Sequence, residues 1–217
     1  MARGGTPRQY MLGGMEIEVE VEVERLRDEG KLKEVATLVV TSYGPEVLGF
    51  LVAMARDHAD AGDAFSQACE DLWRGLPRFR GDASVKTWFY TLARHALSRL
   101  KRSPELRRRA AVSAISQCAD RVRSRTEPYL RSEVSSGVAA IRAQLDDDDR
   151  VLLTLRIDRG MSWNEVAQIM SDEIGSPHDL ARVAARLRQR FQTVKGLIRA
   201  RARAMGIVDA DRDVDGR

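Results

Sequence analysis

The chain contains little cysteine and little histidine. Its 217 residues include two cysteines and three histidines, and Cys69 and Cys118 form no Cys-x-x-Cys pair. This excludes a disulfide framework and the usual spacings of structural zinc ligands. We therefore expect both thiols to be reduced and the protein to need no metal and no cofactor.

Long apolar runs are also missing. No stretch of about 18 apolar residues is present, and the opening residues MARGGTPRQYMLGG lack the apolar core of a signal peptide. The sequence thus predicts a cytoplasmic protein without membrane insertion.

Patterns typical of β-strands are almost absent. The run EIEVEVEVE at 16–24 alternates with period two, but no second segment could pair with it. We interpret residues 1–29 as an acidic N-terminal arm, partly disordered, which could also be the start of a helix or a cover for a basic surface. The rest of the chain predicts an all-α fold.

Charge, in contrast, is abundant and segregated. Residues 74–109 carry 11 Lys or Arg against two acids, whereas residues 16–34 carry eight acids against four bases. Within the basic part, residues 84–102 predict a helix with two faces. The apolar face comprises Val85, Trp88, Phe89, Leu92, Ala93, Ala96, Leu97 and Leu100. The other face is basic and suits a polyanion with bases to stack or bond; a solvated helix face is the alternative.

Two helical segments, 30–43 and 45–57, precede this region, with Pro45 expected at the start of the second. A helix predicted from Asp63 to Leu76 has a polar row that indicates either a protein-binding surface or a solvated face. In the loop that follows, Gly81 gives backbone freedom and Ser84 is expected to cap the next helix.

After Pro104 the helical pattern weakens, so we assign 104–144 to a linker, 145–206 to a second small domain and 207–217 to a disordered tail. Four aspartates at 146–149 are expected at a helix N-terminus, where the helix dipole favours acids. Ser162 and Glu165 predict a capping box for a short helix over 163–170. A long basic helix over 179–205 follows, and this order is typical of a helix-turn-helix.

These segments together resemble a known family. The run DLWRGLPRFRGDASVKTWFYTLARHALSRLKR at 71–102, followed by LDDDDRVLLTLRIDRGMSWNEVAQIM at 145–170 and a basic helix, is similar to the extracytoplasmic-function sigma factors of bacteria. The resemblance covers 31–102 and 145–206. It implies two helical DNA-binding domains, 30–103 and 145–206, on a flexible linker. Such a protein is not an enzyme by itself but a promoter-specificity subunit of RNA polymerase.

The resemblance also implies site residues in the first domain. Core polymerase would be bound by Asp63, Ser66, Gln67, Glu70 and Asp71. The minus-ten element would be opened and held by Arg80, Lys86, Tyr90, Arg94, His95 and Arg99. The chain departs from the family pattern at Ser66 and Gln67, where a Gln-acid pair is common, and at His95, where Asn is common.

In the second domain, the family's Thr-Val-Lys-Ser-Arg pattern fits in two registers, at 193–196 or at 186–190. We prefer the second, because it places the basic cluster near the helix start, where base edges are met. The residues implied for the minus-thirty-five element are Arg182, Arg186, Arg188, Gln189, Arg190 and Lys195.

Three alternatives stay open at this point. A two-domain helix-turn-helix regulator could bind DNA without polymerase contact, and a helical interaction module could bind an acidic protein. A hydrolase using 146–149 with His58, His95 or His178 has no supporting motif. Many members of the family are held inactive by an anti-sigma factor, and the sequence leaves open whether this chain has one.

Overall fold

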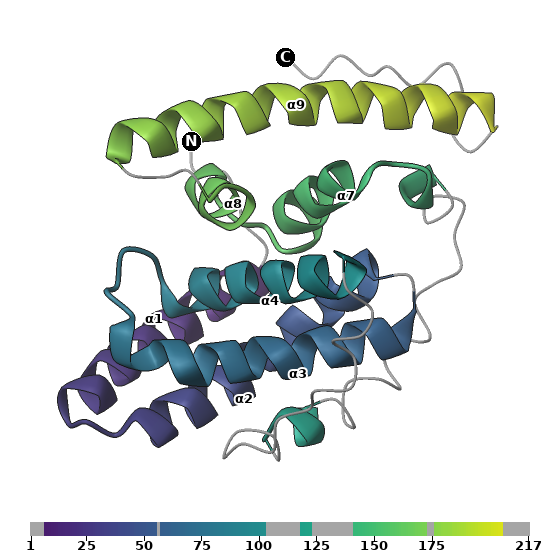
Figure 1. Ribbon diagram of the computed structural model, residues 1–217. Coiled ribbons are helices and arrows are strands. Elements are labelled where there is room, and N and C mark those ends of the chain that lie inside the picture. The colour runs from purple at the N-terminus through teal and green to yellow at the C-terminus, as the bar shows by residue number, and fades with distance from the viewer. Residues whose placement is uncertain (1–6, 56, 103–117, 123–140, 173–175, 206–217) are drawn as a thin grey trace. The chain divides into compact units, whose positions relative to one another are not determined.

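The computed structural model of the chain describes residues 7–55, 57–102, 118–122, 141–172 and 176–205, without the side chains of 7–15 (Figure 1). Within these ranges all regular structure is helical, in agreement with the all-α prediction. The chain divides into two compact units, Met1–Glu127 and Pro128–Arg217.

The described part of the first unit includes the helices α1 (Pro7–Asp28), α2 (Leu32–Met54), α3 (His58–Gly75) and α4 (Val85–Arg102). Helix α2 packs against each of the other three, and α3 also packs along α4. Two aromatic pairs lie in the core. In the first, Phe50 of α2 meets Tyr90 of α4 at a centroid distance of 5.4 Å. Phe65 of α3 meets Phe89 of α4 at 6.2 Å.

Helix α2 corrects the prediction of two separate helices. It continues through Pro45, although proline inside a helix removes a hydrogen bond and costs about 3 kcal/mol. Residues on both sides of the proline, including Val40, Tyr43, Val47 and Leu48, are buried. Burial of this continuous apolar face offsets the local cost.

Helix α2 is also long and apolar enough to span a membrane by length and composition, which the sequence reading did not anticipate. Most of its apolar window is buried inside the first unit. Its composition therefore fits the central helix of a packed core.

Helix α1 corrects the prediction of a partly disordered acidic arm. The chain is helical from Pro7, and Val19, Val23 and Leu26 of α1 are buried. Because these residues are spaced four and three apart, they share one side of the helix. The alternation of period two leaves Ile17 and Val21 on the exposed side. Residues 1–6 lie outside the described residues.

Helix α3 begins earlier than predicted. The Asp57 side chain accepts a hydrogen bond of 2.7 Å from the Asp60 backbone amide and caps the helix, so the residues just before the predicted start at Asp63 are helical. Ala61 is fully buried there. The early start lengthens α3 by somewhat more than one turn.

Residues 118–122 contribute to the core of the first unit, which corrects their assignment to the linker. Cys118, Ala119 and Val122 are buried. A Cβ atom at Gly44 would lie 3.1 Å from a methyl group of Val122, so the glycine permits this close contact. Cys69 and Cys118 are both free and buried. The rest of the linker between 103 and 140, and the tail from 206, lie outside the described residues.

The second unit contains α7 (Asp147–Leu153), a π-helical turn η3 (Thr154–Asp158), α8 (Trp163–Met170) and α9 (Pro177–Ala204). The capping box of Ser162 and Glu165 is confirmed, as is Asp146 at the N-cap of α7. Helix α8 packs on the first half of α9 through Ala167, Val183 and Ala184. This packing leaves the opposite side of α9 exposed.

The core contact of Phe50 gives a test of this architecture. Phe50→Ala removes a fully buried ring and should lower the free energy of unfolding of the first unit by about 3–5 kcal/mol, measured by urea denaturation. Lys33→Ala, on the exposed side of the same helix, should change it by less than about 0.5 kcal/mol. Equal effects of the two substitutions would contradict the packing described.

Candidate nucleic-acid interface

The loop between α3 and α4 forms a hollow on the first unit. It starts with a short 3₁₀ turn, η1 (Leu76–Arg78), and ends where the Ser84 hydroxyl accepts a hydrogen bond of 3.1 Å from the Thr87 amide, which confirms the predicted cap. Gly81 has a φ of 80°, as its expected freedom requires. The hollow is lined by Gly75, Arg78, Phe79, Arg80, Asp82, Ala83 and Trp88. It therefore combines aromatic rings with two exposed arginines.

Aromatic stacking fixes one wall of this hollow. The rings of Phe79 and Trp88 lie 4.6 Å apart and 20° from parallel. A Cβ atom at Gly75 would approach the Trp88 ring to 2.7 Å, so only glycine leaves room for it. Sequence reasoning placed Trp88 on the apolar core face and assigned no role to Phe79, because helical periodicity does not reveal contacts with a loop.

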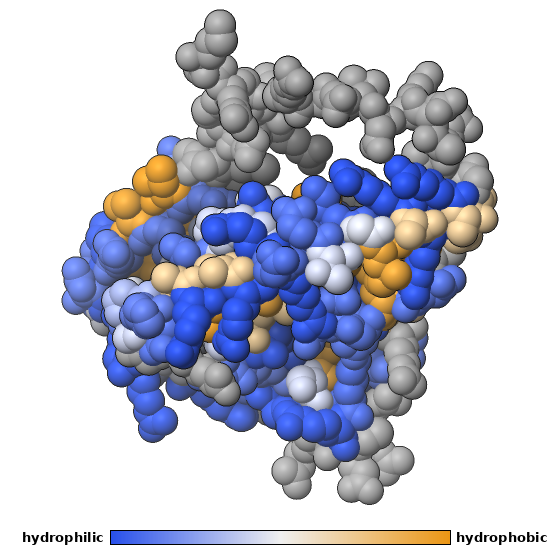
Figure 2. All heavy atoms as spheres, turned by 90° about the horizontal axis from the view of Figure 1, so that it is seen from above, coloured by the Kyte–Doolittle hydropathy of each residue, from blue (hydrophilic) through white to orange (hydrophobic). Residues whose placement is uncertain are grey.

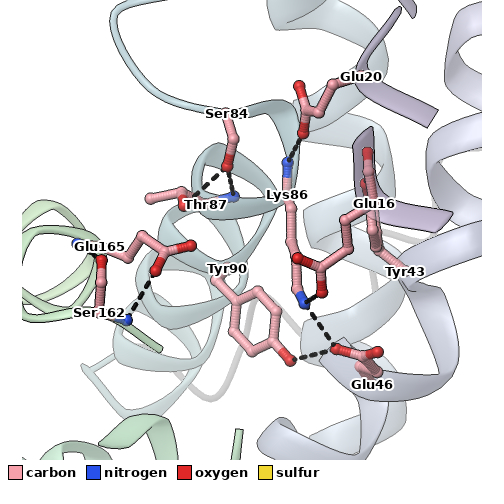
Figure 3. A network of polar contacts seen from close by, with 10 residues as sticks. All are labelled: Glu16, Glu20, Tyr43, Glu46, Ser84, Lys86, Thr87, Tyr90, Ser162 and Glu165. Atoms are coloured by element: carbon pink, nitrogen blue, oxygen red, sulfur yellow. Dashed lines mark hydrogen bonds and ion pairs between the residues drawn. The ribbon is translucent and has the colours of Figure 1, made fainter. Parts of the chain in front are cut away.

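Lys86 does not lie on the exposed basic face predicted for α4, which corrects the sequence prediction. Its side chain is only 9% exposed, and its ammonium group forms ion pairs of 2.5 Å with Glu16 of α1 and 3.2 Å with Glu46 of α2 (Figure 3). Burial by itself would lower the pKa of Lys86, but the hydrogen bond to Glu16 and the charge of Glu46 outweigh it and raise that pKa. Lys86 is thus a charged core residue.

Tyr90 is also buried, contrary to the prediction. Its ring packs on Phe50, and its hydroxyl group lies 3.5 Å from Glu46 at the edge of the same network. The buried side of α4 is therefore wider than the apolar residues alone indicated, because acids from α1 and α2 satisfy the polar groups of Lys86 and Tyr90. Trp88 and Leu92, expected in the core, are partly exposed instead.

Three basic residues of the basic face predicted for α4 are partly exposed: Arg94, His95 and Arg99. A guanidinium nitrogen of Arg94 lies 3.0 Å from Nε2 of His95. Arg99 forms an ion pair with Asp71 of α3. Arg80, at the loop, is strongly exposed and pairs with Asp82 at 2.8 Å. The available basic surface therefore runs from the loop along His95 rather than through Lys86.

The polar row of α3 is only partly accessible. Asp63, Ser66 and Gln67 are half-buried, and the Gln67 amide donates a 2.9 Å hydrogen bond to Asp71. Glu70 is buried, which corrects its placement on an exposed row; one of its carboxylate oxygens has no hydrogen-bond partner. Since Asp71 also pairs with Arg99, the row predicted for protein contact is joined directly to the basic side of α4.

In the second unit, α9 exposes a row of polar side chains. Arg182, Arg186, Gln189 and Thr193 are exposed and recur at intervals of four, three and four residues, so they share one side of the helix. Figure 2, seen from the side on which α9 lies in Figure 1, shows mainly hydrophilic residues with a few apolar patches. Arg186 and Gln189 of this row belong to the register at 186–190, and Thr193 belongs to the register at 193–196.

Arg190 has a different environment from the other residues that are predicted to contact the minus-thirty-five element. Its guanidinium group lies 2.5 Å from Asp149 and 3.0 Å from Asp146, at the start of α7. Burial by itself would lower the pKa of Arg190, but the hydrogen bond that it donates to Asp149 and the neighbouring acidic charges raise that pKa. Asp146 thus caps α7, and Asp146, Asp148 and Asp149 hold α9 through Arg190.

Arg188 and Lys195 contact aromatic rings. The Arg188 guanidinium lies 5.5 Å from the centroid of Trp163, and that of Arg156 lies 5.0 Å from it. The Lys195 ammonium lies 5.7 Å from the centroid of Phe191, whose ring meets Trp163 edge to face. The Arg188 contact joins α9 to α8 and the Arg156 contact joins η3 to α8, roles that the sequence pattern did not indicate.

The Lys86 network gives a pH-dependent prediction. Because the pKa of Lys86 is raised, its contribution to stability is complete below about pH 10.5, the ordinary value, and is lost as the pH rises through the higher folded value. Lys86→Met should cost about 1–3 kcal/mol at neutral pH, a figure reduced for the partly exposed glutamates. The stability difference between the two proteins, from denaturation at pH 8 to 12, should shrink only at the alkaline end. A constant difference would contradict the network.

Comparison with known proteins agrees with this geometry. The family model of sigma-70 region 2 matches residues 39–109, which include α3, the loop and α4. The RNA polymerase sigma-H factor of Pseudomonas aeruginosa is 29% identical over 152 residues, which cover 66% of this chain and 79% of the relative. The ECF RNA polymerase sigma-E factor of Escherichia coli is 28% identical over 147 residues, covering 64% and 76%. The RNA polymerase sigma factor YlaC of Bacillus subtilis is 26% identical over 129 residues, covering 59% and 75%.

The matched region is the part of the chain that holds the hollow, the polar row of α3 and the basic side of α4. The similarity to the sigma factors extends beyond that region, since it covers about three quarters of each relative. The sigma-70 region 2 match and the relatives named as RNA polymerase sigma factors together support an extracytoplasmic-function type of sigma factor.

Proposed function

We propose that this protein binds core RNA polymerase and directs promoter recognition, melting and transcription initiation. The observation that carries the proposal is the coincidence of the sigma-70 region 2 match with the loop hollow and the two polar surfaces beside it. As a sigma factor it is a non-catalytic subunit, so the polymerase supplies the chemistry. We expect it to act in the cytoplasm, where promoter DNA is located. An anti-sigma factor stays a prediction from the family resemblance.

The hollow beside Trp88 is the part of the first unit best suited to a single-stranded base of the minus-ten element. Stacking of a base on an aromatic ring contributes about 1–3 kcal/mol and can offset the cost of unstacking it from the duplex. Trp88 and Phe79 supply rings, and Arg78 and Arg80 supply positive charge for the adjoining phosphates. His95 and Arg99 extend the basic surface along α4.

The polar side of α3 is proposed as the polymerase contact. Asp63, Ser66 and Gln67 remain partly accessible there. Asp71 is largely covered by its ion pair with Arg99, and Glu70 is buried. These two acids therefore support the contact surface from beneath, by orienting neighbouring side chains, instead of meeting the partner themselves.

Helix α9 is proposed to read the duplex of the minus-thirty-five element, with α8 and α9 acting as a helix-turn-helix. The exposed row of Arg182, Arg186 and Gln189 lies on the first half of the helix, opposite the α8 contact. Arginine can donate two hydrogen bonds to a guanine edge in the major groove, and glutamine can do the same to adenine.

Transcription from a promoter by core polymerase, with and without the purified chain, tests this function. A DNA-binding regulator without polymerase contact would bind the duplex but give no promoter-specific transcript. Initiation that depends on the added chain is the expected result, and its complete absence would refute the proposed function.

His95→Ala should separate promoter melting from duplex binding. His95 is partly exposed on α4, about two helical turns beyond Trp88. Its loss should slow open-complex formation about tenfold, followed by 2-aminopurine fluorescence in the minus-ten element, while duplex affinity stays unchanged. Tyr90→Ala is unsuitable for this test, since Tyr90 is fully buried and its truncation would destabilise the core. Equal loss of melting and duplex binding in His95→Ala would contradict its role.

Arg186→Gln and Arg190→Gln form a matched pair in α9. Arg186 is exposed, so its substitution should weaken specific duplex binding about tenfold or more and reduce discrimination at one base pair. Arg190 is held by Asp146 and Asp149, so its substitution should mainly lower the thermal stability of the second unit. Fluorescence anisotropy with specific and scrambled duplexes, together with thermal denaturation, distinguishes the two. A loss of discrimination from Arg190→Gln alone would reverse the assignment.

A further inference from the structure

Helix α1 reaches one end of the loop over residues 79–84 through Glu20. One carboxylate oxygen of Glu20 accepts a hydrogen bond of 3.1 Å from the backbone amide of Val85. The other accepts one of 3.3 Å from the backbone amide of Lys86 (Figure 3). These amides belong to the first turn of α4 and have no partner within that helix. A carboxylate is also favoured there by the helix dipole. Glu20 therefore fixes the point at which the loop enters α4.

The other end of the loop is held by Arg27 of the same helix. Its guanidinium group donates a hydrogen bond of 2.5 Å to the carbonyl oxygen of Phe79. The same group lies 5.0 Å from the centroid of the Phe79 ring, within the range of a cation–π contact. Phe79 in turn stacks on Trp88. One arginine therefore orients both the backbone and the ring at the start of the loop.

The two contacts come from one side of α1. Glu20 and Arg27 are seven residues apart, which is about two helical turns and roughly 10 Å along the axis. Val23, between them, is 1% exposed, and Leu26 is also buried, so this side of α1 is anchored in the core. The helix can therefore set the distance between the two ends of the loop.

The middle of the loop is much less restrained. Arg80, Gly81 and Asp82 are exposed, and the ion pair between Arg80 and Asp82 lies in solvent, where such pairs contribute little. Gly81, with its positive φ, is the residue type with the greatest backbone freedom. The shape of the hollow therefore depends on how the two ends of the loop are held.

We propose that Glu20 and Arg27 are positioning residues through which α1 clamps both ends of this loop and keeps the hollow beside Trp88 ready for an extruded DNA base. This rests on the proposed function of the hollow. Neither residue touches the base; each acts through the backbone or ring that forms the site. The N-terminal helix is thereby part of promoter recognition, although its charged side chains over residues 16–28 are mainly acidic.

The test uses the full chain bound to core polymerase. Glu20→Ala and Arg27→Gln remove the two contacts, and Glu20→Gln and Arg27→Lys are conservative variants that retain an acceptor oxygen and a cation. Glu18→Gln and Arg25→Gln are matched controls, since both residues are exposed on α1 away from the loop. The first measurement is hydrogen exchange of the amides over 79–86. The second is the affinity for a single-stranded DNA oligonucleotide selected with the wild-type holoenzyme from a pool of random sequence.

Glu20→Ala and Arg27→Gln should each raise amide exchange over 79–86 and weaken binding of the single strand by about tenfold, the effect of losing a hydrogen bond to a charged group. Affinity for core polymerase and for duplex DNA should not change. The conservative variants should recover much of the loss. Thermal denaturation identifies any variant that fails to fold, in which case the conservative variant at that position carries the test.

Two results would overturn the clamp. One is unchanged exchange over 79–86 in both variants, and the other is increased exchange with single-strand affinity equal to that of the controls. Failure of the proposed function gives a different result: wild-type holoenzyme would then select no oligonucleotide, whereas the exchange measurement would still report whether α1 holds the loop.

Discussion

The buried ammonium group of Lys86 is the interaction on which the first unit depends most. A charge removed from water is tolerated only when it is paired and hydrogen-bonded. The two acids that pair with it come from different helices, Glu16 from α1 and Glu46 from α2, while Lys86 itself belongs to α4. One cation therefore fixes the mutual placement of three helices. It also brings α1 to a position from which Glu20 and Arg27 reach the neighbouring loop.

This arrangement changes where DNA recognition can occur on the first unit. The basic side of α4 is narrower than its composition indicates, because Lys86 and Tyr90 belong to the core. What remains accessible is a loop with a stacked aromatic pair and a short basic surface along His95. Such a site suits a single base that fits into a hollow. Helix α9, in contrast, offers a row of exposed side chains that suits the edges of stacked base pairs.

Both units also neutralise part of their positive charge internally. Arg99 is paired with Asp71 and Arg190 with Asp146 and Asp149, so these arginines contribute less to the attraction of DNA than unpaired ones would. The pairs instead connect helices: α3 to α4 in the first unit, and α7 to α9 in the second. In each unit the cations nearest the helix joints give structural stability, and the more exposed ones, such as Arg80 and Arg186, stay accessible to a nucleic acid.

Several features could be predicted from the sequence because their causes are local. The period of apolar residues gave the range of α4, the Ser-x-x-Glu pattern gave the start of α8, and Ser84 gave the cap of α4. The quoted motifs were specific enough to indicate the sigma factor family, which the comparisons confirm. Local sequence patterns could not reveal three other features. These are the burial of Lys86 and Tyr90, the continuity of α2 through Pro45 and the docking of α1. They depend on side chains that are remote in sequence: Lys86 is 70 residues from Glu16 and Arg27 is 52 residues from Phe79. Local patterns show which residues share a side of a helix, whereas only the tertiary structure decides what that side meets, because a charged side chain can be buried wherever a distant partner compensates it.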